Sequence, residues 1–212
     1  MQGGAHLGLV ASPFDRPILA VQRRNSACVL TRPDVFVPNV KGEWIHPDNA
    51  TVAEMAELAH QCPSGAIRCE TKDEKSLEAP PLVNTVRLQE NGPLAFHADL
   101  RIGQDEPQFR ATLCRCGASS SKPYCDNSHA KVAFAATGEP ATTESEPLSS
   151  RSGPLVIEPV PNGPLHLSGP VELVSGTGRT INRTTETWLC RCGHSANKPY
   201  CDGTHKKVGF QA

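Results

Sequence analysis

The stretch TLCRCGASSSKPYCDNSHAKVAF at residues 112–134 returns as WLCRCGHSANKPYCDGTHKKVGF at residues 188–210. The two stretches align without a gap, 76 positions apart, and fifteen of the twenty-three aligned positions are identical. Self-similarity within one chain indicates a structural unit that occurs more than once. The second half of the chain is therefore predicted to contain two copies of one small module.

Each copy of the repeat carries cysteine and histidine at the spacing C-x-C-x8-C-x3-H. Side chains alternate along an extended segment, so the C-x-C pair directs both sulfurs to the same side. The third cysteine and the histidine stand four residues apart, which places them on one face of a helical turn. An aspartate, Asp126 or Asp202, follows the third cysteine at a position typical of a helix N-cap. The candidate ligands form two sets of four: Cys114, Cys116, Cys125 and His129, then Cys190, Cys192, Cys201 and His205.

Three thiolates and one imidazole suit two kinds of metal centre. One is a tetrahedral zinc ion, and the other is an iron–sulfur cluster. Zinc sites commonly separate paired cysteines by two to four residues, whereas a gap of one residue fits two thiolates on one iron of a binuclear cluster. The spacing favours the cluster and leaves zinc open.

Short runs rich in β-forming residues lie upstream of each motif. We expect strands at 82–88, 94–102, 109–114, 155–160, 164–174 and 180–190, with hairpin connections at 103–107 and 175–179. Residues 136–152 are small, polar and interrupted by proline, the composition of a linker. The predicted organisation is a first module at 79–135, a linker at 136–152 and a second module at 153–212.

Residues 1–78 differ in character from the repeat. Asp48–Gln61 has apolar residues at helical spacing, which predicts an amphipathic helix. Asn49 or Thr51 suits its N-cap, and the sequence Pro63-Ser64-Gly65 suits its end. The predicted fold class is therefore α+β, with two small β-rich modules behind one small mixed domain.

Charge and cysteine content narrow the class of protein. The 212 residues include 21 basic and 22 acidic side chains, a net charge of −1, which gives no support for binding nucleic acid or a membrane surface. No run of eighteen apolar residues exists, and the start of the sequence lacks the pattern of a secretion leader. Nine cysteines in such a chain indicate a reducing compartment, which predicts a cytoplasmic protein.

CRCGASSSKPYCDNSH (114–129) and CRCGHSANKPYCDGTH (190–205) resemble the CDGSH iron–sulfur domain of mitoNEET-like proteins, whose pattern is C-x-C-x2-[ST]-x3-P-x-C-D-G-[ST]-H. The second copy fits every fixed position, and the first departs once, at Asn127, where the family has glycine. The resemblance covers roughly residues 80–212 and implies two 2Fe-2S clusters, one per motif, with the histidines as the ligands nearest solvent. Family members form dimers with a swapped β-cap, so the tandem copy implies an internal pseudo-dimer and a monomeric chain.

One histidine among four ligands has consequences for a bound cluster. A neutral imidazole in place of a thiolate removes one negative charge, which raises the reduction potential. Acid would release the cluster, because protonated histidine cannot hold iron. Between the paired cysteines lie Arg115 and Arg191, which are expected to place positive charge near the cluster. The alternative is that both are ordinary surface side chains exposed to solvent.

The N-terminal region resembles a divergent single-cluster ferredoxin domain through three elements: DVF at 34–36, WIHPDNA at 44–50 and QCPSGAI at 61–67. Of the cysteines that bind the cluster in that family, only Cys28 and Cys62 have matches here, and Cys69 departs from the pattern. Because clusters of this kind need three or four cysteines, we expect a ferredoxin-like fold at residues 1–78 that has lost its cluster.

No glycine-rich phosphate loop, nucleophile–base pair or pair of carboxylates indicates a catalytic centre, so the chain is not expected to be an enzyme. The leading hypothesis is a carrier that transfers electrons, or that stores and donates 2Fe-2S clusters in response to redox state or pH. Its partner would be a redox protein or an apo-protein that accepts the cluster. Two alternatives remain: a zinc-stabilised interaction module, and an electron-transfer subunit of an oxidoreductase complex.

Overall fold

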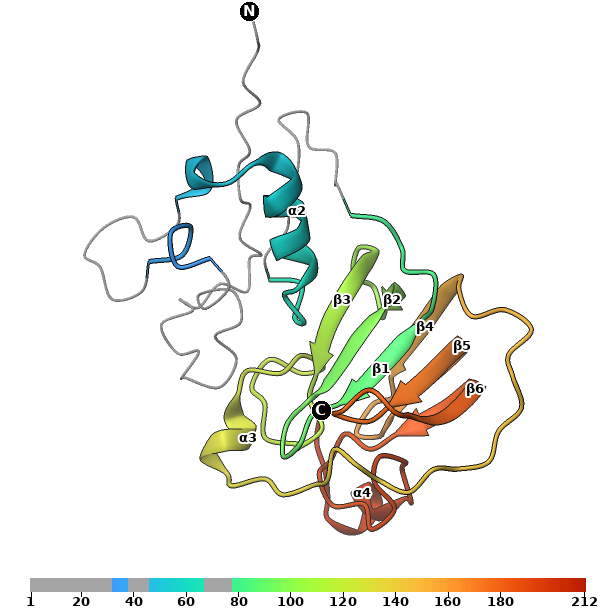
Figure 1. The fold of residues 1–212 in the computed structure, drawn as a ribbon. Helices are drawn as coiled ribbons and strands as arrows, with labels where there is room; N and C mark the ends of the chain where they lie inside the picture. Colours follow the sequence, from blue (N-terminus) through green and yellow to red (C-terminus); the bar gives the residue numbers. More distant parts are fainter. Residues whose placement is uncertain (1–31, 38–45, 67–77) are drawn as a thin grey trace, which may run out of the picture. The chain divides into compact units, whose positions relative to one another are not determined.

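The computed structural model describes residues 32–37, 46–66 and 78–212 (Figure 1). The chain falls into two compact units, which are divided in the sequence between Ala79 and Pro80. The predictions for Cys28 and Cys69 lie outside the described residues.

The described residues of the first unit contain a 3-10 helix, η2 (Pro47–Asn49), and an α-helix, α2 (Val52–His60). At the start of α2, the Thr51 hydroxyl accepts a hydrogen bond from the Glu54 amide, and the Glu54 carboxylate accepts one from the Thr51 amide at 2.8 Å. This capping box satisfies two amides that would otherwise lack partners. The predicted helix and its Thr51 cap are confirmed. One small core cluster is made of Val35, Phe36, Met55, Leu58, Ala59 and Cys62.

The second unit is mostly β, with two halves made of matching elements. The first half contains β1 (Thr85–Leu88), β2 (Leu94–Ile102), β3 (Gln108–Leu113) and the short helix α3 (Ser128–Lys131). The second half contains β4 (Pro154–Pro159), β5 (Leu165–Val174), β6 (Thr180–Leu189) and the short helix α4 (Thr204–Lys207). All six strands and both hairpin connections predicted from the sequence are confirmed, with ends displaced by no more than three residues.

The strands of each half pair antiparallel in chain order, β1–β2–β3 and β4–β5–β6. Two further pairings cross between the halves. β1 runs parallel to the end of β5, with Val86 opposite Leu173, and β4 runs parallel to the end of β2, with Ile157 opposite Ile102. The first strand of each half thus extends the sheet of the other half, and the six strands form one hydrogen-bonded sheet.

Both halves contribute to a shared apolar core. Leu94 and Phe96 from β2, and Leu165 and Leu167 from β5, are at most 1 % exposed. Burying one such side chain contributes about 1.5–3 kcal/mol. Separating the halves would expose this surface, so we expect the two modules to fold as one unit.

Residues 136–152, which connect the halves, are hydrogen-bonded along β6. The Thr143 amide donates to the Ile181 carbonyl at 2.9 Å, and the Arg183 amide donates to the Ser145 hydroxyl at 3.1 Å. Near the end of the segment, Arg151 and Glu172 form an ion pair at 2.7 Å. The segment with linker composition is therefore a strap held against the second module.

Every cysteine within the described residues is a free thiol. Of the helices in these same residues, none is long and apolar enough to cross a membrane.

Candidate metal centres

The first set of predicted ligands lies directly after β3. Cys114 and Cys116 follow that strand, and their Sγ atoms are 3.7 Å apart. The chain then turns back, so that the Cys114 amide donates to the Pro123 carbonyl at 2.8 Å. This return brings up Cys125, whose Sγ lies 3.4 Å from Nδ1 of His129. We call these four residues the first cradle.

The second set repeats the arrangement after β6. The Sγ atoms of Cys190 and Cys192 are 3.8 Å apart, and Cys201 Sγ lies 3.4 Å from Nδ1 of His205. The returning segment pairs in the same way, because the Cys190 amide donates to the Pro199 carbonyl at 2.8 Å. These four residues form the second cradle.

Each cradle contains two close pairs of donors, one of two sulfurs and one of a sulfur and a nitrogen. Across residues 32–37, 46–66 and 78–212, no three Cys, His, Asp or Glu side chains converge on a position that could hold a single metal ion. A structural zinc site places four ligands around one ion, and two thiolates 3.7–3.8 Å apart suit such an ion as well. Two pairs of donors suit the two metals of a binuclear centre.

Backbone amides donate to the sulfurs of both cradles. The pairs are Ala118 to Cys116 and Asn127 to Cys125 at 3.5 Å, and His194 to Cys192 and Gly203 to Cys201 at 3.4 Å. A hydrogen bond to the charged form of a group stabilises that form. The turns are therefore built to hold negatively charged sulfur.

The hydrogen bond between the paired thiols of the first cradle shifts their pKa values in opposite directions. It lowers the pKa of Cys114 and raises the pKa of Cys116. Burial raises the pKa of Cys125 to about 11 and also raises the pKa of Cys192. Metals bind thiolates, so loading these cradles would release protons.

The histidines are half-buried, whereas Cys114 and Cys190 are each 1 % exposed. His129 and His205 both turn Nδ1 toward the sulfur of the nearby cysteine, which makes Nδ1 the candidate ligand atom. Burial lowers the pKa of His129 although the Asp126 carboxylate opposes the shift. Its imidazole is therefore neutral at pH 7 and can donate a lone pair.

Asp126 and Asp202 support the turn before each short helix, but the prediction that they are N-cap residues is wrong. The left-handed residues Asn127 and Gly203 take the N-cap positions, one residue later. Each aspartate still accepts two backbone amides, one from either side of the turn. Although burial opposes it, these bonds hold the pKa of Asp126 well below its usual range.

Arg115 and Arg191 are 1 % and 3 % exposed, so the alternative of solvated surface is wrong. Each donates only to backbone carbonyls: Arg115 to Gln89, Gly92, Ala136 and Thr137, and Arg191 to Val160 and Gly163. Burial lowers the pKa of Arg115 to about 10, so the side chain stays charged at neutral pH. The expected positive charge is present, and it also ties each motif to the turn between the first two strands of its module.

The two cradles meet across the modules at their C-x-C-G turns. A Cβ atom at Gly117 would lie 2.5 Å from the Cys192 carbonyl oxygen, and one at Gly193 would lie 2.5 Å from the Cys116 carbonyl oxygen. Both glycines also have positive φ, 79° and 83°. Only glycine permits this approach in that conformation.

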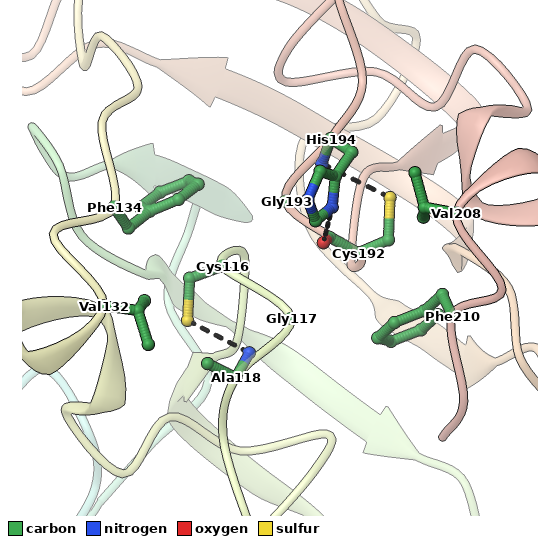
Figure 2. A pocket seen from close by; sticks show the side chains of 10 residues that line it. All are labelled: Cys116, Gly117, Ala118, Val132, Phe134, Cys192, Gly193, His194, Val208 and Phe210. Atoms are coloured by element: carbon green, nitrogen blue, oxygen red, sulfur yellow. Dashed lines mark hydrogen bonds between the residues drawn. The ribbon is translucent and has the colours of Figure 1, made fainter.

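Beside this contact lies an open hollow of about 410 Å³ (Figure 2). Figure 2 shows one set of lining residues on either side of it. The sets match one another: Cys116, Gly117, Ala118, Val132 and Phe134, facing Cys192, Gly193, His194, Val208 and Phe210. Sequence reasoning missed the valines and phenylalanines, although the identity of K-V-x-F in both copies was the available signal.

In the first unit, Cys62 is 6 % exposed, and its Sγ lies 3.3 Å from the Ser64 hydroxyl. Cys28 and Cys69, the other cysteines considered for a cluster there, lie outside the described residues. The described part of this unit thus shows one packed, hydrogen-bonded thiol.

Two family models match the chain. The family described as "Iron-binding zinc finger CDGSH type" matches residues 80–130 and 162–206. The family described as "Divergent 4Fe-4S mono-cluster" matches residues 21–72. Comparison with curated proteins finds no match. Both resemblances stated from the sequence are confirmed.

Proposed function

Because this chain carries two CDGSH-type iron-binding segments behind a divergent mono-cluster segment, we propose that each cradle binds one 2Fe-2S cluster through three cysteines and one histidine. The protein then serves as a carrier that passes electrons or whole clusters to other proteins, without a catalytic centre of its own. The proposed ligands are Cys114, Cys116, Cys125 and His129 for one cluster, and Cys190, Cys192, Cys201 and His205 for the other.

The observation that carries this proposal is the arrangement of the donors in pairs. Sulfur–sulfur distances of 3.7 and 3.8 Å, and sulfur–nitrogen distances of 3.4 Å, bring together two ligands at a time. Three thiolates and one imidazole are a ligand set that iron–sulfur clusters accept. The thiol pair suits one iron, and the cysteine–histidine pair suits the other.

When bound, a 2Fe-2S cluster supplies one-electron redox chemistry. The chain supplies the charge balance and the geometry around it. Amides that donate to sulfur stabilise thiolates, and Asp126 holds the turn that carries Cys125 and His129. Arg115 keeps a buried positive charge between the paired cysteines, which favours the more negative, reduced form.

The deciding experiment is a visible absorption spectrum of the purified full chain, with iron, acid-labile sulfide and zinc measured per chain. Two clusters predict about four irons and four sulfides. The main alternative, a zinc-stabilised interaction module, predicts a colourless protein with about two zinc ions and no sulfide. That second result would overturn the proposal.

The role proposed for the histidines has its own test. Protonated imidazole cannot hold iron, so the visible absorbance should be lost as the pH falls. Replacing His129 and His205 by cysteine should move this loss to lower pH and slow transfer of the cluster to an apo-ferredoxin. Unchanged acid lability in the double variant would show that another group controls release.

For the first unit we propose a ferredoxin-like fold without a cluster. Cys62 is packed against Ser64, and only Cys28 provides a second ligand that fits the pattern of that family. A four-iron cluster normally takes four cysteines. An iron content well above four per chain would contradict this proposal and place a cluster here.

The strand pairing supports a further proposal, that the two modules form an internal pseudo-dimer and the chain is a monomer. β1 on β5 and β4 on β2 are reciprocal pairings, with Val86 opposite Leu173 and Ile157 opposite Ile102. Light scattering on the purified chain tests the monomer. We also propose, from the cysteine content, that the protein works in a reducing compartment. A second possible role is that of an electron-transfer subunit in an oxidoreductase complex. A flavoprotein that co-purifies in fixed ratio would favour the latter.

A further inference from the structure

The surface around the hollow between the cradles is apolar at its centre. Val132 and Val208, at the ends of α3 and α4, are 54 % and 45 % exposed. Phe134 and Phe210 line the same hollow, one from each module (Figure 2). Large apolar side chains that gather on an exposed patch mark an interaction site.

Basic residues directly precede both valines in the sequence. Lys131, Lys206 and Lys207 are exposed and lie on α3 and α4, next to the two valines. Of the seven Lys or Arg residues in the stretches 112–134 and 188–210, Arg115 and Arg191 are buried and these three lysines are exposed. The two aspartates in these stretches are already engaged by backbone amides. Exposed positive charge therefore lies beside both valines of the hollow, in a chain whose net charge is −1.

Two of the proposed ligands line the hollow. Cys116 and Cys192 both line it, as do Gly117 and Gly193 at the contact between the modules. The one polar side chain that interrupts the symmetry is His194, opposite Ala118, and its Nδ1 donates to the Cys192 carbonyl at 2.8 Å. A molecule seated in the hollow would thus lie against ligands of both cradles at once.

We propose that this inter-cradle face, made of Val132, Phe134, Val208 and Phe210 with Lys131, Lys206 and Lys207, docks an acidic partner protein that inserts an apolar side chain into the hollow. The proposal rests on the function proposed above and names the surface through which it operates. Charge complementarity between the three lysines and acidic groups would steer association. A central apolar anchor in a pocket would supply most of the binding energy, and electron-transfer interfaces of this kind are small.

The test uses the full chain and an acidic apo-ferredoxin as the probe, with cluster transfer followed by visible circular dichroism. One variant combines Lys131→Gln, Lys206→Gln and Lys207→Gln, and a second combines Val132→Ser and Val208→Ser. The matched control is Val156→Ser, an exposed valine on β4. A second probe is the same apo-ferredoxin with its surface carboxylates amidated. It tests the contribution of charge attraction to the transfer rate without altering this chain. Rates are measured from about 0.01 to 1 M salt, over which charge interactions pass from long-range to screened.

We expect the lysine variant to lose about tenfold in rate at low salt and little at high salt. The double valine variant should lose about fivefold at every salt concentration, since an apolar contact is not screened. Val156→Ser should behave as the unmodified chain. Three results would overturn the docking proposal: equal rates for all variants, a loss in Val156→Ser equal to that of the double valine variant, or unchanged transfer to the amidated probe. These results are also expected if the hollow binds a small molecule and not a protein.

Iron and sulfide are measured in each variant before the rates. An intact chain without sulfide would overturn the proposed function and the docking proposal together. Full cluster content with rates insensitive to the face and to salt would overturn the docking proposal alone.

Discussion

The two cradles are alike in their donors and different in their surroundings. The thiol pairs are 3.7 and 3.8 Å apart, and both cysteine–histidine pairs are 3.4 Å apart. Around these donors, the first cradle has Ala118, Asn127 and a buried Arg115 with four carbonyl acceptors, and the second has His194, Gly203 and an Arg191 with two. Residues that repeat thus set the geometry of the donors, while the groups around the donors differ between the cradles.

The arginines show how the connection between the modules creates such a difference. The two additional acceptors of Arg115 are the carbonyls of Ala136 and Thr137, at the start of the strap. That strap is also fixed by the Gly138 amide, which donates to the Glu90 carboxylate at 2.5 Å. The first cradle is therefore tied to the segment that reaches across to the second module.

The largest expected effect comes from removing one ligand from one cradle. Cys125→Ser should abolish the first cluster and leave the second, because the donors of the two cradles are separate sets. Iron should fall from about four to about two per chain, with the visible absorbance halved. Cys201→Ser is the mirror variant. Loss of all the iron from either single variant would show that the cradles do not load independently.

Removing the buried arginine of each module should lower the free energy of unfolding by different amounts. Arg115→Ala leaves four carbonyls without their donor and should lower the free energy of unfolding by about 3 kcal/mol, whereas Arg191→Ala leaves two and should lower it by about 2 kcal/mol. Urea unfolding of both variants checks this order. Arginine-to-lysine replacements, which keep the charge, serve as controls. A reversed order would show that the number of acceptors does not decide the cost.

The turn before each short helix should give a smaller effect. Gly203 has φ 84°, and a Cβ there would meet nothing within 4 Å, so Gly203→Ala brings backbone strain without a clash. We expect a loss of about 1–2 kcal/mol in unfolding free energy. Asn127, at φ 66°, already tolerates the left-handed region, and Asn127→Gly should change stability by less than about 1 kcal/mol. Equal effects at both positions would contradict this account.

The smallest effect should come from a titrating group that only the second module has. His166 stacks on Trp188 at 4.8 Å, and hydrogen bonds with Glu186 and then Glu158 raise its pKa. Its contribution to stability is full below its unfolded pKa of about 6.5 and is lost as the pH rises through the higher folded pKa.

Replacing His166 by glutamine should remove this pH dependence and change the free energy of unfolding by less than about 1 kcal/mol, since the partner carboxylates are exposed. Unfolding measured at several pH values between about 5 and 8 tests it. The equivalent pair in the first module is Ala95 and Thr112, which cannot titrate. A pH dependence that survives His166→Gln would point to another group.

Much of the fold could be predicted because its signals are local. Strand limits followed from β-forming runs between turn residues, and Thr51 was one of two residues expected to cap α2. The error at Asp126 was also local: spacing alone does not reveal that Asn127 is left-handed and displaces the cap by one residue. Burial of Arg115 was beyond local reasoning, because its acceptors lie more than twenty residues away.

The sequence by itself determined the repeat, the two sets of four donors and the strands that present them, because each depends on spacing within one segment. The tertiary structure decided which contacts form between the two modules. Parallel pairing of β1 with β5, the approach of Gly117 to the Cys192 carbonyl, and the hollow between the cradles all join residues from different modules. Register and close approach between distant segments come from packing and long-range hydrogen bonds, which no local pattern of residues encodes.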